Sequence, residues 1–198
     1  MIAAFPGARW VAGKITQYGH GVCARNGKCC DCAPMEHVYA FNWEARPSDT
    51  DSGRFLAAGA LRSFWLRTKQ GYLAEGLPLL RSALRECEQE VEGETANLIL
   101  ESNTLLEFVK PSLYLMVLDA AKDDFKQSAR RQMNEASAFV LRRSMGAAAA
   151  DGTRVGWSGI SERVDSKPQF LQREGEELPA GLRARVSVTL SDGAAIAL

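Results

Sequence analysis

Residues 97–119 contain two short apolar runs, Leu98-Ile99-Leu100 and Leu113-Tyr114-Leu115-Met116-Val117-Leu118, and a carboxylate follows each run directly, Glu101 and Asp119. Unbroken apolar runs of this length, bounded by breakers, are typical of strands that are buried on both faces of a parallel sheet. In open α/β sheets, ligands bind outside the carboxyl ends of the strands. We therefore predict an α/β fold in which Glu101 and Asp119 lie at the edge of the sheet where a nucleotide-type ligand would bind.

Strand-like and helix-like segments alternate through the first 143 residues. The apolar residues of one segment are spaced by four and three, which predicts an amphipathic helix: Leu73, Leu77, Leu80, Leu84, Cys87 and Val91. Further helices are expected at Ser52–Ala58 and around Phe125–Met133, and further strands at Trp10–Thr16, Leu61–Arg67 and Ser137–Leu141. This alternation indicates βαβ units and a mostly parallel sheet with flanking helices.

The domain organisation follows from where this pattern stops. We expect one α/β domain over residues 1–143, with a Cys-rich insertion at 17–37. After Arg143 the glycines and alanines show no periodicity, Arg183–Leu190 alternates only weakly, and Ser191-Asp192-Gly193 offers a turn. Residues 144–198 are therefore predicted to be an irregular C-terminal extension, either a hairpin, a loop or a disordered tail.

Composition narrows the class of protein. The chain has 198 residues, 46% of them hydrophobic, which is enough for one domain with a core. The 24 basic and 24 acidic side chains cancel, so there is no electrostatic case for binding nucleic acid or an anionic membrane. No apolar run approaches the roughly 20 residues that span a bilayer, and Met1–Phe5 is too short for a signal peptide. We expect a cytoplasmic protein, in which cysteines are reduced thiols or metal ligands rather than disulfides.

A cluster of soft metal ligands is the first candidate site. It comprises Cys23, Cys29, Cys30 and Cys32, with His20 and His37 on either side. Thiolates with imidazole select zinc over magnesium and can supply a tetrahedral structural site. The spacing is not a repeated Cys-x2-Cys pair, so reduced surface thiols and a redox pair are alternatives. A catalytic cysteine is less favoured, because the sequence indicates no base for it.

Acidic residues at element boundaries are the second group of candidates. Asp51 lies in the run Asp49–Arg54 before a short helix, where either Asp51 or Ser52 can be the helix cap. Glu101, at a strand end, can hold magnesium directly or through water, or it can cap the following turn. Asp119 precedes a helix start, where carboxylates are common. Taken singly, each of these residues is better explained by a structural role.

Together, several stretches resemble P-loop proteins of the molybdopterin-guanine dinucleotide biosynthesis accessory type. A bacterial branch of this family has a segment similar to Lys14–Gly21 before a cysteine cluster. The resemblance covers roughly Ala8–Leu141 and rests on four further stretches in the same order: Asp51–Ala60, Phe64–Arg67, Leu98–Asn103 and Leu113–Asp119.

The resemblance implies a nucleoside triphosphate, GTP, bound with magnesium. Glu101 matches the acidic residue at the end of the family's Walker-B-like strand, and Asp51 matches the acidic residue before its Ala-Gly-Ala turn. Asp119 matches the acid after a later strand, and the match does not decide whether it contacts a base. Lys14, at the end of the first predicted strand, would usually be just a solvated lysine, and it is a candidate only because of its neighbour Thr16 and the loop that follows.

The chain departs from the family at the phosphate loop. No Gly-x-x-x-x-Gly-Lys-Thr/Ser motif occurs in the sequence, and Gly13-Lys14 lacks the leading glycine. The backbone N–H groups and the lysine of that loop carry most of the phosphate binding. Two interpretations follow: the chain is truncated, with the first strand and the phosphate loop before Met1, or it is a degenerate relative that no longer binds nucleotide.

The functional expectation combines these points. We expect an uncharacterised relative of GTP-binding proteins linked to molybdenum cofactor biosynthesis that does not bind nucleotide on its own. Magnesium and GTP would be cofactors only of a longer form that contains the phosphate loop. The alternative is a non-catalytic zinc-binding or partner-binding module, in which the cysteine-rich loop carries the function.

Overall fold

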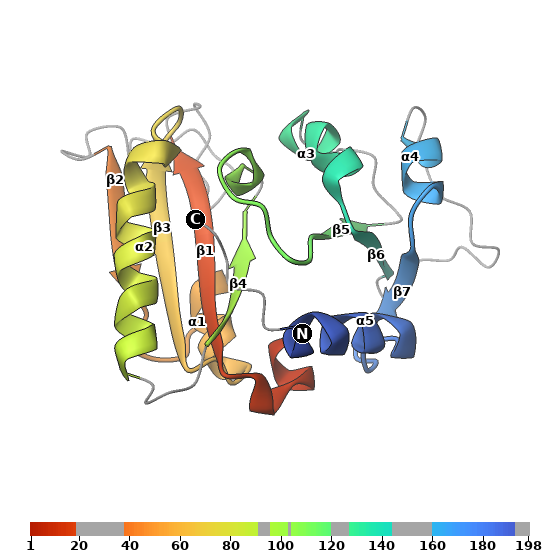
Figure 1. The fold of residues 1–198 in the computed structure, drawn as a ribbon, viewed down its shortest axis with the longest axis horizontal. Coiled ribbons are helices and arrows are strands. Elements are labelled where there is room, and N and C mark those ends of the chain that lie inside the picture. The colour runs from red at the N-terminus through yellow and green to blue at the C-terminus, as the bar shows by residue number, and fades with distance from the viewer. Residues whose placement is uncertain (19–37, 91–95, 103, 120–126, 144–159, 193–198) are drawn as a thin grey trace. The chain divides into compact units, whose positions relative to one another are not determined.

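The computed structural model describes residues 1–18, 38–90, 96–102, 104–119, 127–143 and 160–192 (Figure 1). The chain divides into two compact units, Met1–Phe108 and Val109–Ala197, so the division falls inside the predicted 1–143 domain. The α/β class is confirmed, but the strands form two sheets instead of one, because each unit has its own sheet. Among the described residues, no helix combines the length and the apolar character that crossing a bilayer requires.

The first unit contains a four-stranded mixed sheet in the order β2-β3-β1-β4. In its interior, β1 (Trp10–Tyr18) runs parallel to both β3 (Arg62–Lys69) and β4 (Asn97–Glu101), as the apolar runs predicted. The edge strand β2 (Tyr39–Trp43) is antiparallel to β3. No strand was predicted at β2, whose five residues closely follow the cysteine-rich segment and include the polar, exposed Asn42.

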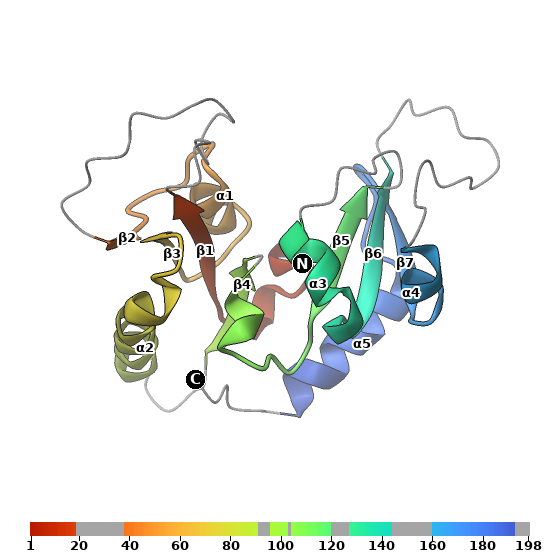
Figure 2. The same ribbon diagram turned by 90° about the horizontal axis from the view of Figure 1, so that it is seen from above.

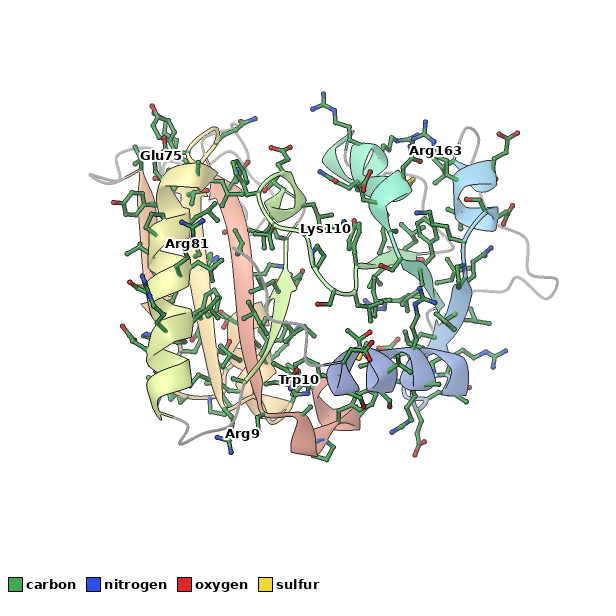
Figure 3. The ribbon with its side chains drawn as sticks, viewed as in Figure 1. Arg9, Trp10, Glu75, Arg81, Lys110 and Arg163 are labelled. Carbon is green, nitrogen blue, oxygen red and sulfur yellow. The ribbon has the colours of Figure 1, made fainter. Side chains whose placement is uncertain are left out.

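Two helices cover opposite faces of this sheet (Figure 2). The predicted amphipathic helix is confirmed as α2 (Leu73–Glu90), in which Leu73 and Leu80 are buried, whereas the burial of Cys87 and Val91 lies outside what the structure describes. Its exposed side includes Glu75 and Arg81 (Figure 3). The short helix α1 (Asp51–Ala57) ends before Gly59, whose φ of 99° suits a glycine. At the N-terminus, two 3-10 turns, Ile2–Ala4 and Pro6–Ala8, precede β1.

Phe64 is the centre of the core on the α2 side. Its ring is fully buried, stacks on Phe41 at 5.0 Å between ring centres, and meets Trp43 edge-on at 5.7 Å. Gly13 in the neighbouring strand leaves the space that this ring fills. A Cβ atom at Gly13 would collide with Phe64 and lie 2.7 Å from Leu100 Cδ2. The packing on this face therefore holds β1, β3 and β4 in register.

The second unit contains a three-stranded parallel sheet in the order β5-β6-β7. The strands are β5 (Leu115–Asp119), β6 (Ala138–Arg143) and β7 (Gln169–Arg173), with α3 (Gln127–Gln132) and a 3-10 turn (Met133–Glu135) between the first two. The core comprises Met116, Leu118, Met133, Ala136, Phe139, Leu141, Ile160 and Val164. Tyr114 packs against this core, and burial raises the pKa of its phenol to about 12.

The C-terminal stretch corrects one prediction. Instead of an irregular extension, the described part of residues 144–198 contains α4 (Ser161–Asp165), β7 and α5 (Ala180–Ser191). The weak alternation in Arg183–Leu190 belongs to a helix, because the buried residues of α5 are Leu182 and Val186, four apart on one helical face. Alternation of small and charged residues was therefore not evidence of a strand.

Candidate functional site

A lysine and two carboxylates meet on one face of the first sheet. Lys14, in the middle of β1, is in register with Glu101 at the carboxyl end of β4. Asp51 is the first residue of α1. The Lys14 Nζ atom lies 3.1 Å from Asp51 Oδ2 and also donates to Glu101 Oε1. The parallel pairing of β1 and β4 thus places Glu101 beside Lys14. The helix α1, which lies between β2 and β3 in the chain, brings Asp51 to the same lysine.

The structure shows that Asp51 is not a helix cap. Thr50 has the extended backbone of an N-cap residue, and its Oγ1 accepts a hydrogen bond of 3.0 Å from the Gly53 N–H. Neither Asp51 nor Ser52 has the capping role that the sequence analysis weighed. The Asp51 carboxylate is instead directed to Lys14.

The start of α1 is fixed firmly to its surroundings. The buried Ser52 hydroxyl donates to Glu44 Oε1, and the Ser63 hydroxyl of β3 donates to the Ser52 carbonyl at 2.7 Å. A Cβ atom at Gly53 would collide with the Ser48 hydroxyl and lie 2.8 Å from the Ser48 nitrogen. These contacts set the position of the Asp51 backbone independently of its own side chain.

Glu101 also has no capping role. Ser102 takes that role, because its hydroxyl oxygen accepts hydrogen bonds from the Thr104 N–H at 3.2 Å and the Leu105 N–H at 3.1 Å. The capping roles considered for Asp51 and Glu101 are thus taken by a neighbouring hydroxyl residue in each case, Thr50 beside Asp51 and Ser102 beside Glu101. What the structure assigns to the two carboxylates is a shared contact with Lys14.

The charges and exposure of the cluster favour a further cation. Lys14 is 18% exposed, whereas the side chains of Asp51 and Glu101 are 57% and 56% exposed. One ammonium faces two carboxylates, so the cluster has one negative charge in excess. Lys14 Nζ already occupies the position between the two carboxylates, so a metal ion binds both acids only in place of the ammonium or through their other, exposed oxygens. Magnesium takes one or two carboxylates and completes its octahedron with water, which fits this donor set.

The remaining predicted site residues are Asp119 and the proposed zinc ligands. Asp119 ends β5 and belongs to the second unit, so the predicted common edge for Glu101 and Asp119 is wrong. The proposed zinc ligands all lie outside the described residues, and their site stays a prediction: His20, Cys23, Cys29, Cys30, Cys32 and His37. Within the part of the chain that the structure describes, no three His, Cys, Asp or Glu side chains gather as a metal site.

The sequence analysis missed an aromatic and basic group on the same sheet face as Lys14. The Trp65 indole N–H donates to the Thr16 hydroxyl at 2.8 Å, and the Arg67 guanidinium lies 4.7 Å from the centre of the Trp65 ring. The register pairs Lys14 with Trp65 and Thr16 with Arg67, so all four side chains share one face. The period-two alternation of Phe64-Trp65-Leu66-Arg67, with Phe64 and Leu66 on the buried face, was the available signal.

Comparisons of the chain with protein-family models, with curated proteins and with solved structures find no significant match. The geometry of the site is therefore the main support for a function.

Proposed function

We propose that this protein is an α/β domain of the nucleotide-binding type, related to GTP-binding proteins linked to molybdenum cofactor biosynthesis, in which Asp51 and Glu101 form the magnesium side of the site. The observation that carries the proposal is the shared contact of both carboxylates with Lys14 Nζ. This contact brings two carboxylates, whose oxygens are donors that magnesium prefers, close to one nitrogen at the carboxyl end of the parallel strand β4. That end of a parallel sheet is where α/β proteins bind their ligands.

The residues present fit magnesium, but they do not fit the whole of a triphosphate. The sequence contains no glycine-rich phosphate loop, and that loop supplies the N–H groups that bind the β- and γ-phosphates. The proposal therefore assigns to these 198 residues a cation site and no hydrolytic step.

Manganese titration tests the cation site, because Mn²⁺ takes the same oxygen ligands and is visible by electron paramagnetic resonance. We expect weak binding of one Mn²⁺ that Mg²⁺ displaces. Glu101→Gln or Asp51→Asn should weaken binding by about tenfold or more, as is typical when a metal loses part of its ligand environment. Lys14→Met should have the opposite effect, because it removes the ammonium that competes with the metal.

The matched control for the manganese titration is Glu107→Gln, an exposed glutamate of the same unit. This substitution removes one negative charge outside the cluster, so Mn²⁺ affinity should not change. Equal loss of affinity in Glu107→Gln and Glu101→Gln would show that binding reflects net charge alone, and would contradict the proposal.

GTP itself should not bind measurably to this chain, with or without magnesium. The physical reason is the absence of the phosphate loop, whose N–H groups and lysine supply most of the affinity. Isothermal titration calorimetry with GTP and ATP measures this directly. Micromolar affinity would contradict the prediction and would mean that other residues hold the triphosphate.

A second candidate function rests on the four cysteines between Cys23 and Cys32. We propose as the alternative a zinc-binding or partner-binding module, with thiolates as the main ligands. Protein purified without added metal is expected to contain about one zinc per chain, measured by native mass spectrometry and elemental analysis. Chelation should then make the thiols reactive. Metal-free protein whose thiols all react at once with a thiol reagent would exclude this site.

A further inference from the structure

An arginine with an unsatisfied N–H group lies close to the proposed cation site. Arg67 is half-buried in β3, its Nε atom is buried, and this atom has no hydrogen-bond partner in the described structure. The part of the chain that the structure describes places no carboxylate in ion-pair contact with Arg67. Burying a guanidinium N–H without an acceptor is unfavourable. The buried Nε itself is out of reach of solvent, so an acceptor that binds from outside would meet the terminal nitrogens of the half-buried guanidinium.

The neighbours of Arg67 orient its guanidinium without using its hydrogen-bond donors. Trp65 is fixed by the hydrogen bond of 2.8 Å from its indole N–H to Thr16 Oγ1. Arg67 lies over the ring of this indole, at 4.7 Å from the ring centre, in a cation–π contact. This contact uses none of the guanidinium's hydrogen-bond donors, so its terminal N–H groups can still bind an anion.

The strand register brings this arginine to the same face as the acidic cluster. β1 lies between β3 and β4 (Figure 1). Lys14 is in register with both Trp65 and Glu101, and Arg67 is two residues beyond Trp65 toward the carboxyl end of β3. A cation position and an unsatisfied guanidinium thus occupy adjacent rows of one sheet face. A ligand that binds a divalent metal and also carries further negative charge fits this arrangement.

We infer that Arg67, oriented by Trp65 and Thr16, binds a phosphate oxygen of the ligand whose metal is held by Asp51 and Glu101. Arginine is suited to this role because its planar fork matches two oxygens of a phosphate at once. The identity of the ligand as a metal-bound phosphate rests on the proposed function, whereas anion binding by Arg67 does not.

Pyrophosphate is the probe, titrated without divalent metal into the ¹⁵N-labelled full chain. The readout is the indole N–H signal of Trp65, assigned through a Trp65→Phe variant. We expect this signal to shift and to saturate at millimolar pyrophosphate, but not in sodium chloride of matched ionic strength. Arg67→Met should weaken the apparent affinity by about tenfold or more, the size expected for a lost charge-assisted hydrogen-bond pair. Arg81→Met, which removes an exposed positive charge from α2 on the opposite face of the sheet, should leave it unchanged.

An unshifted Trp65 signal, an equal shift in chloride, or equal affinity of Arg67→Met and the unmodified chain would each overturn the inference. Unchanged indole signals of Trp10 and Trp43 in the Arg67→Met spectrum verify that the variant is folded, and Arg67→Lys provides a second variant that should bind with intermediate affinity. Because this titration contains no metal, it is independent of the manganese titration. A negative pyrophosphate titration therefore does not contradict the cation site, and a negative manganese titration does not prevent the test of Arg67.

Discussion

Phe64→Ala is expected to destabilise the first unit more than any other single truncation in that unit. The Phe64 ring is fully buried between Phe41, Trp43 and the space left by Gly13. Removing a buried phenyl group costs about 3–5 kcal/mol, because the apolar contacts are lost and a cavity remains. That is a large part of the roughly 5–15 kcal/mol by which a typical domain is stable.

Urea unfolding followed by tryptophan fluorescence is the measurement for Phe64→Ala, since Trp10, Trp43 and Trp65 all lie in the first unit. Phe108→Ala is the matched control, because Phe108 belongs to the same unit but is 42% exposed. Phe108→Ala should lower the free energy of unfolding by less than about 1 kcal/mol. Similar losses for the two variants would show that Phe64 is not the centre of this core.

Self-association through β4 is the second large effect that we expect. β4 is an end strand of the first sheet, and Leu98, Ile99 and Leu100 are each half-buried there. Their unbroken apolar pattern suits a strand with neighbours on both sides, whereas β4 pairs with β1 alone among the described strands. An apolar edge strand promotes association with other chains. The protein should therefore form oligomers at concentrations where Ile99→Lys is monomeric.

Sedimentation velocity over a range of concentrations measures this association. Leu61→Lys is the control, because it makes the same change at a residue that is 52% exposed and precedes β3. A monomeric unmodified chain at all concentrations would contradict the prediction. The prediction would also be contradicted if Leu61→Lys dispersed the oligomers as well as Ile99→Lys does, because the β4 edge would then have no special role.

Local patterns predicted most strands correctly, because short apolar runs bounded by turn residues are easily seen in the sequence, even where one face is exposed, as at Val117, which is 57% exposed. The runs around Val11, Leu66, Ile99, Val117 and Val140 all became strands of parallel pairs. The same patterns could not show that the strands divide into two sheets. Which strands are neighbours depends on long-range pairing, and a run such as Leu98-Ile99-Leu100 looks the same in the interior and at the end of a sheet.

The candidate site was predicted in part. Asp51 and Glu101 were identified from their positions at element boundaries, and the structure brings them together through Lys14. Lys14 itself was a weak candidate, because a single lysine in a strand gives no sign of its partners until the register is known. Asp119 was wrongly placed with Glu101, since both follow similar strands but in different units.

The most direct test of the cation site is the paramagnetic effect of Mn²⁺ on the amide signals of the ¹⁵N-labelled protein. Substoichiometric Mn²⁺ should broaden the signals of Lys14, Asp51, Ser52 and Glu101 before any others, and excess Mg²⁺ should restore them. The same signals should stay sharp in Glu101→Gln at equal Mn²⁺. Broadening that centres instead on another exposed acidic segment, such as Glu174–Glu177, with the Lys14 and Glu101 signals unaffected, would contradict the account.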